Sequence, residues 1–181
     1  MLAATAARTG RAQPCPSPSR QALARQKRAL LELGAVLTSP GRARAWTRKT
    51  LRVWQLGGLA EDAETIIGEL AANAVQASAD LNQPVIRFVL AFNDRELAIL
   101  VADGNPELPH VQHPAGDAES GRGLLMVAAL SDRYGWCPLE GGTTGKAVWA
   151  VLRARRMHLA TSPLASPPQA LALPDEQIGI R

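Results

Sequence analysis

Two oxygen-bearing side chains, Glu69 and Asn73, stand four residues apart in the segment ELAANAV. In a helix, this spacing places both side chains on the same face. The amide oxygen of Asn73 is a hard ligand of the kind that Mg²⁺ prefers, and the Glu69 carboxylate can orient a water molecule or accept a hydroxyl proton. The same pair is also compatible with an ordinary solvated helix edge. The spacing therefore predicts either a magnesium–phosphate site or a polar helix margin.

A second polar feature, Asp103-Gly104-Asn105, ends the apolar run ILVAD. A carboxylate at the rim of a sheet can accept a hydrogen bond from an exocyclic amine such as that of adenine. The absence of a side chain at Gly104 would let a flat ring approach the backbone. The alternative interpretation is an Asx turn that simply follows a strand.

A third feature, Gly121-Arg122-Gly123-Leu124, precedes an apolar segment of helical character. Glycines at the start of a helix expose backbone N–H groups to an anion, and the helix dipole favours negative charge there. The alternative is a flexible hinge. The motif is neither a P-loop nor a strand-led G-x-G-x-x-G, so the two most common nucleotide-binding folds are disfavoured.

The elements that must position these residues follow from periodicity and turn residues. Helices are predicted over 39–56, 60–78 and 121–130, and strands over 85–92, 96–102, 133–138 and 147–153. Asn93-Asp94-Arg95 forms the turn of a hairpin, and 104–120 is a long loop. Strands that follow one another through short turns pair antiparallel. The expected fold is therefore α+β, a two-layer α/β sandwich with a mostly antiparallel sheet and helices on one face.

Charge and hydropathy exclude several classes of protein. The 181 residues carry 20 Lys and Arg against 16 Asp and Glu, a net charge of +4. Residues 1–30 hold six basic groups and no acid, and residues 154–181 have a net charge of +1, which leaves −3 for residues 31–153. Direct nucleic-acid binding by the folded part is therefore not expected. Nor is a membrane span, because no apolar run approaches the roughly 20 residues required. With no secretory signal in view, the expected location is cytoplasmic.

Composition divides the chain into three parts. We expect a flexible basic N-terminal arm at 1–30, one folded domain at 31–153, and a flexible Pro/Ala-rich tail at 154–181. Residues 21–33 are compatible with a basic helix. The arm is either a solvated segment or a contact for a partner or an anionic surface, and a basic protein that associates with DNA or membranes through its tails is the weakest functional alternative.

Together, the three features resemble the ATP-binding fold of the GHKL (Bergerat-fold) proteins, which include gyrase B, Hsp90, histidine kinases and MutL. The segments ELAANAVQAS, LVADGNPELP, SGRGLLMVAALSDRYGW and GKAVWAVL are most similar to the anti-sigma-factor serine/threonine protein kinases and related actinobacterial ATP-binding regulators. The resemblance covers about residues 37–153.

The resemblance implies a role for each motif. Asn73 would be the Mg²⁺ ligand, Glu69 the general base, and Asp103 the residue that reads adenine. The remaining nucleotide contacts would come from Gly104, Asn105, Gly121, Arg122, Gly123, Leu124 and Lys146, with Lys146 reaching a phosphate group and 104–120 closing as a lid. Two departures bear on ATP affinity: Asn105 stands where the family pattern usually has glycine, and Ala147 stands where many relatives carry threonine. Asn tolerates a left-handed backbone, which would make the first departure mild.

The function implied by this resemblance is a regulatory serine protein kinase. It would transfer the γ-phosphoryl group of ATP to a serine of an anti-anti-sigma (STAS-like) partner, with ATP and Mg²⁺ as cofactors. The alternative is an ATP-gated binding module that sequesters a sigma factor or another regulator with little turnover. In that case the arginines of the 39–56 helix, Arg44, Arg48 and Arg52, are candidate contacts. A homodimer is plausible through the resemblance.

Overall fold

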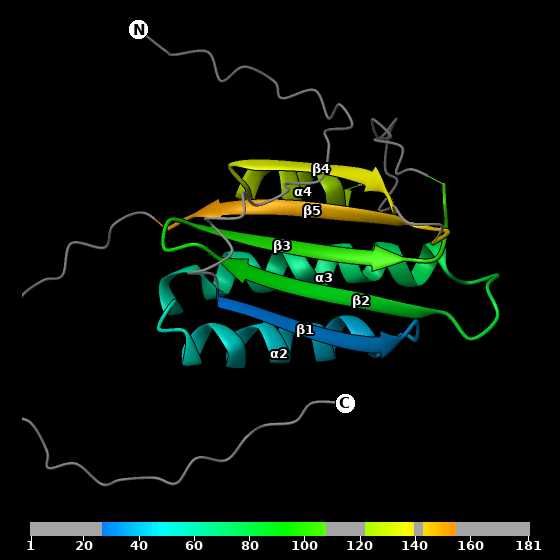
Figure 1. The fold of residues 1–181 in the computed structure, drawn as a ribbon, viewed down its shortest axis with the longest axis horizontal. Coiled ribbons are helices and arrows are strands. Elements are labelled where there is room, and N and C mark those ends of the chain that lie inside the picture. The colour runs from blue at the N-terminus through cyan, green and yellow to red at the C-terminus, as the bar shows by residue number, and fades with distance from the viewer. Residues whose placement is uncertain (1–26, 108–121, 140–142, 155–181) are drawn as a thin grey trace, which may run out of the picture.

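The structure, a computed structural model, describes residues 27–107, 122–139 and 143–154 (Figure 1). The predictions for the N-terminal arm before residue 27, the loop residues 108–120, Gly121 and the C-terminal tail lie outside these residues. The side chain of Arg122 is likewise not described.

The described part of the chain forms a five-stranded antiparallel sheet in the order β1-β2-β3-β5-β4. Its strands are β1 (Lys27–Gly34), β2 (Val85–Phe92), β3 (Glu96–Asp103), β4 (Arg133–Pro138) and β5 (Lys146–Arg153). The β2–β3 hairpin turns where predicted. Asn93 Oδ1 accepts hydrogen bonds from the backbone N–H groups of Arg95 (3.1 Å) and Glu96 (2.8 Å), and Asp94 takes the left-handed conformation with φ of 67°.

The helices cover one face of this sheet, which confirms the predicted α+β sandwich (Figure 1). They are α2 (Ser39–Val53), α3 (Ala60–Ala77) and α4 (Arg122–Leu130), with a short 3₁₀ helix, η1 (Gly57–Leu59), between the first two. The Ser39 hydroxyl at the start of α2 donates to the Gly34 carbonyl oxygen at 2.6 Å, which links the helix to the end of β1.

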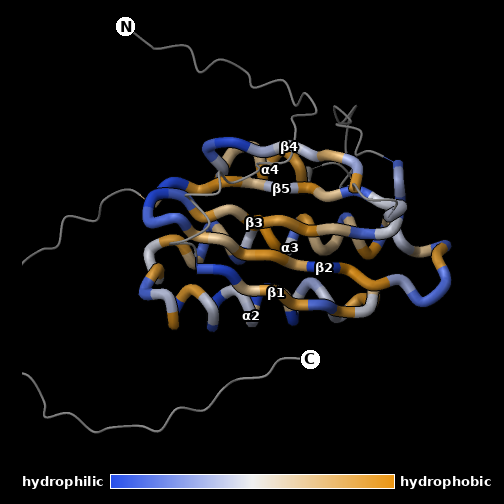
Figure 2. The backbone as a smooth tube through the Cα atoms, in the orientation of Figure 1, coloured by the Kyte–Doolittle hydropathy of each residue, from blue (hydrophilic) through white to orange (hydrophobic). Residues whose placement is uncertain are grey.

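Alternation along the strands decides which side chains reach the helices. Leu97, Ile99 and Val101 of β3 are buried in the main core together with the inner face of α3. The intervening residues of the strand point to the opposite face, because successive side chains of a strand alternate. Figure 2 shows the apolar character concentrated along the central strands and α3.

The segment 21–33 was compatible with a helix, and this expectation is wrong where the structure describes it. Lys27–Gly34 is strand β1, paired antiparallel with β2. Leu33 is buried at 5% exposure, whereas Leu30 on the other side of the strand is 50% exposed. The strand begins inside the stretch assigned to the N-terminal arm. Pairing with the exposed edge of β2 overrides the helix propensity of Ala, Leu, Lys and Arg.

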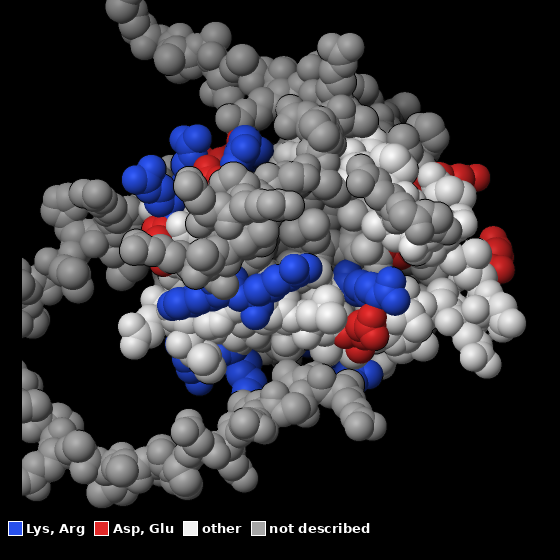
Figure 3. Space-filling view, in the orientation of Figure 1, with Lys and Arg blue, Asp and Glu red and all other residues white. Residues whose placement is uncertain are grey.

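The helix-free face of the sheet has two regions. Ala147, Trp149, Val151 and Cys137 form a second apolar cluster on β4 and β5. Figure 3 shows a band of Lys and Arg side chains elsewhere on this face, with an acidic group beside it. None of the helices in the described ranges has the length and apolar character that a bilayer crossing requires.

Candidate functional site

Helix α3 carries the first pair of predicted site residues. Glu69 is half-buried and Asn73 is exposed. Within the described residues, neither side chain makes a hydrogen bond or an ion pair. Neither has a polar atom that is buried without a hydrogen-bond partner. Among the described residues, the carboxylate and the amide are therefore both without a competing partner.

The start of α4 lies directly against this pair. A Cβ atom added to Gly123 would stand 2.7 Å from Glu69 Oε2 and 3.7 Å from Asn73 Nδ2. Gly123 thus brings the α4 N-terminus to the two polar side chains of α3. Arg122 is the first residue of α4, and Leu124 is half-buried against the main core.

Asp103 ends β3 on the helix-covered side of the sheet. It follows Leu97, Ile99 and Val101 in the strand alternation and is only 3% exposed. Its Oδ1 atom accepts the backbone N–H of Asn105 at 3.0 Å, which forms the Asx turn considered as an alternative. The turn and a ligand-binding role are compatible, because each carboxylate oxygen can accept more than one hydrogen bond.

Asn105 links this turn to α3. Its Nδ2 atom donates to the carbonyl oxygen of Ala77, the last residue of the helix, at 2.7 Å. The expected left-handed backbone is not found at Asn105. The hydrogen bond from its side chain to Ala77 explains instead why asparagine stands at this position. It holds the Asp103 turn to α3 one helical turn beyond Asn73, so the contacts from Glu69 to Ala77 span roughly 12 Å at 1.5 Å per residue.

Lys146 lies at the Asp103 end of this row. Its ammonium donates to Asp103 Oδ1 at 2.9 Å and to the Asn105 carbonyl oxygen at 3.1 Å. Lys146 and Asp103 are also direct partners in the β3–β5 register. The sequence suggested that Lys146 reaches a phosphate group. The structure instead places its ammonium in a buried ion pair with the carboxylate expected to read adenine.

The residue before it, Gly145, has a structural role that composition did not reveal. Its φ is 137°, and a Cβ atom there would collide with the backbone carbonyl oxygen of Asp103. Glycine is therefore required for the chain to pass beside the Asp103 turn. The only sequence signal for this role is the glycine-rich stretch 141–145.

Ala147 does not belong to the site. It lies on the helix-free face with Trp149 and Val151, whereas Lys146 shares the helix-covered side with Val148. The departure noted at Ala147 therefore lies on the face of the sheet opposite Lys146. A shift of one residue moves a side chain to the opposite face of a sheet.

The arrangement suits a magnesium–nucleotide complex. Asn73 offers a hard oxygen, and Glu69 offers a carboxylate that no other described residue pairs with. Gly123 leaves open a space that any side chain would fill. Asp103 and Lys146 lie at the other end of the row and carry directional hydrogen-bonding groups. The residues present therefore fit such a ligand.

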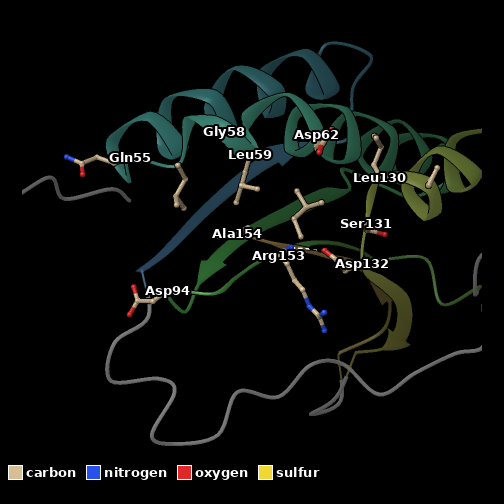
Figure 4. Close-up of a pocket in the computed structure, with 13 residues that line it drawn as sticks. Gln55, Gly58, Leu59, Asp62, Asp94, Leu130, Ser131, Asp132, Arg153 and Ala154 are labelled. Atoms are coloured by element: carbon tan, nitrogen blue, oxygen red, sulfur yellow. Dashed lines mark hydrogen bonds between the residues drawn. The ribbon is translucent and has the colours of Figure 1, made fainter. Parts of the chain in front are cut away.

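A separate cavity of about 690 Å³ lies at the opposite end of the molecule (Figure 4). It is formed by the first turn of α3, the last turn of α4 and the end of β5. Its lining includes Leu59, Asp62, Leu130, Asp132 and Arg153. None of the predicted site residues contributes to it, so it has no part in the site on α3.

The antiparallel sheet with helices on one face is the architecture of a GHKL-type ATPase domain. A family model described as a histidine kinase-like ATPase domain matches residues 34–152. The chain belongs to this family, which confirms the family-level resemblance, and ATP is the ligand that an ATPase domain implies.

No curated protein matches the chain. Among solved structures, it is similar to the crystal structure of the RsbU and RsbW domains of Rv1364c from Mycobacterium tuberculosis. That match has 20% sequence identity and a TM-score of 0.48, and it covers 70% of this chain and 32% of the other. The chain thus corresponds to about a third of that longer protein.

Proposed function

We propose that this protein is an ATP-dependent serine protein kinase of the anti-sigma-factor type, which regulates transcription by transferring the γ-phosphoryl group to a serine of an anti-anti-sigma partner. The observation that carries the proposal is the contact of Gly123 with Glu69 and Asn73. It brings a carboxylate, a hard oxygen ligand and a helix N-terminus to one place. Phosphoryl transfer depends mainly on such positioning and electrostatics.

Each residue of the chain has a defined task in this proposal. Asn73 would hold Mg²⁺, and Glu69 would accept the proton of the attacking serine hydroxyl. The backbone N–H groups at the start of α4 would face the phosphates, where the helix dipole favours negative charge. Asp103 would accept a hydrogen bond from the base. Bound Mg²⁺–ATP supplies the transferable phosphoryl group and neutralises its charge.

The test is transfer of label from γ-labelled ATP to a candidate STAS-domain acceptor. We expect Glu69→Gln to lower the transfer rate by about 10²- to 10⁴-fold, the usual contribution of a general base. We expect Asn73→Ala to weaken the dependence on Mg²⁺. If the Glu69→Gln variant transferred phosphate at the wild-type rate, Glu69 would not be the general base.

A second function, an ATP-gated module that sequesters a sigma factor or another regulator, is favoured by the surface of α2. Arg44 and Arg52 are exposed and make no ion pair within the described part of the chain. Arg48 is already engaged, because its guanidinium donates to Glu64 and this hydrogen bond raises the pKa of Arg48. Partner capture that requires ATP, survives Glu69→Gln and is lost in Arg44→Glu would favour sequestration over transfer.

A further inference from the structure

The ion pair between Asp103 and Lys146 is almost sealed from solvent. The two side chains are 2% and 6% exposed, and their charged atoms are 2.9 Å apart. Burial of a charged pair costs desolvation free energy that the attraction between the charges only partly offsets. A pair of this kind at the rim of a site calls for an explanation beyond stability.

Each partner of the pair has hydrogen-bonding capacity left. Asp103 Oδ1 accepts both Lys146 Nζ and the Asn105 backbone N–H, while Oδ2 accepts no hydrogen bond from the described residues. The Asp103 side chain retains a small exposed fraction of 2%. The Lys146 ammonium has three hydrogens, and within the described residues two acceptors lie in reach.

We propose that Lys146 is a base-selecting residue, which donates a hydrogen bond to the N1 atom of adenine while Asp103 Oδ2 accepts one from the adenine amino group. The inference rests on the proposed binding of ATP and identifies how the base would be read.

The chemistry of the base edges supports this assignment. Adenine presents a donor, its 6-amino group, next to an acceptor, N1. The Asp103–Lys146 pair presents the complementary acceptor and donor. Guanine has the reverse order, an acceptor at O6 and a donor at N1. Its O6 would face the acceptor Asp103, and its N1–H would face the donor Lys146, so neither hydrogen bond could form. A site whose polar groups are left unpaired by the wrong ligand rejects it strongly.

The experiment compares Mg²⁺-dependent binding of ATP, GTP and 1-deaza-ATP to the whole chain by isothermal titration calorimetry. In 1-deaza-ATP a C–H group replaces N1 and the amino group is kept. We expect wild-type protein to bind ATP about 10- to 100-fold more tightly than 1-deaza-ATP, the range for hydrogen bonds to charged groups. In Lys146→Met that ratio should fall to about one, because the donor to N1 is gone. Lys49→Met, the same change on the exposed surface of α2, should keep the wild-type ratio.

The outcomes separate the inference from the proposed function. Wild-type protein that binds no ATP would remove both. Wild-type protein that binds ATP and 1-deaza-ATP equally, or a Lys146→Met variant that still prefers ATP by the wild-type ratio, would remove only the role of Lys146. If Lys146→Met does not fold, as judged by circular dichroism, Lys146→Arg takes its place. Its planar guanidinium changes the donor geometry, and an unchanged ratio would again overturn the inference.

Discussion

We expect the Gly123→Ala substitution to lower the rate of phosphoryl transfer with little effect on the free energy of unfolding. The new Cβ atom would lie 2.7 Å from Glu69 Oε2, whereas ordinary contact begins at 3.4 Å, so the carboxylate must move by about 0.7 Å. A displacement approaching 1 Å at reacting groups lowers a rate by about 10²-fold. The obstructed atom is the end of a flexible side chain, and Gly123 does not have a positive φ. Alanine there should therefore leave the free energy of unfolding unchanged or raise it by about 0.4–1 kcal/mol.

The assay measures the transfer rate with γ-labelled ATP and the free energy of unfolding in urea for the same variant. Gly41→Ala is the matched control, because Gly41 lies in the first turn of α2 and a Cβ atom there meets nothing within 4 Å. The control should keep the wild-type rate. A Gly123→Ala variant that transfers phosphate at the wild-type rate would refute the reasoning about Glu69. A loss of several kcal/mol of stability would show that the contact is structural.

Three further predictions concern the fold around the site. Gly145→Ala should lower the free energy of unfolding by at least about 1–3 kcal/mol in urea, because of its positive φ and the collision with the Asp103 backbone. Leu33→Ala should cost about 2–5 kcal/mol and Leu30→Ala less than about 0.5 kcal/mol by the same measurement; equal costs would favour a helix, in which residues three apart share a face. Lys146→Met should cost about 3–5 kcal/mol by leaving Asp103 buried without its partner. Adding Asp103→Asn should recover much of this loss in thermal denaturation, and no recovery would contradict the pairing.

Local patterns in the sequence were sufficient for much of the architecture. The helical period predicted α3 to within one residue, and the turn residues predicted the β2–β3 hairpin. The glycine motif predicted a helix over 121–130, and α4 begins at Arg122. These signals are local, because side-chain period and turn conformation depend on residues close together in the chain.

Strand β1 could not be predicted from its own residues, because it forms only by pairing with β2. Ala29, Leu31 and Leu33 face the core in alternation, but Leu30 stands on the opposite face and obscures the period of two. The residue types of KRALLELG also favour a helix. Only the free edge of β2, more than 50 residues away, decides that this segment is a strand.

The sequence by itself predicted which residues are candidates for binding a nucleotide, and the tertiary structure decided how they are combined. The pairing of Asp103 with Lys146 depends on the register between β3 and β5. In a sheet, a shift of one residue reverses the face of every side chain. That parity brings Lys146 to the site, sends Ala147 to the other face, and requires glycine at position 145. Register is set by packing across the whole sheet, so no local pattern contains it.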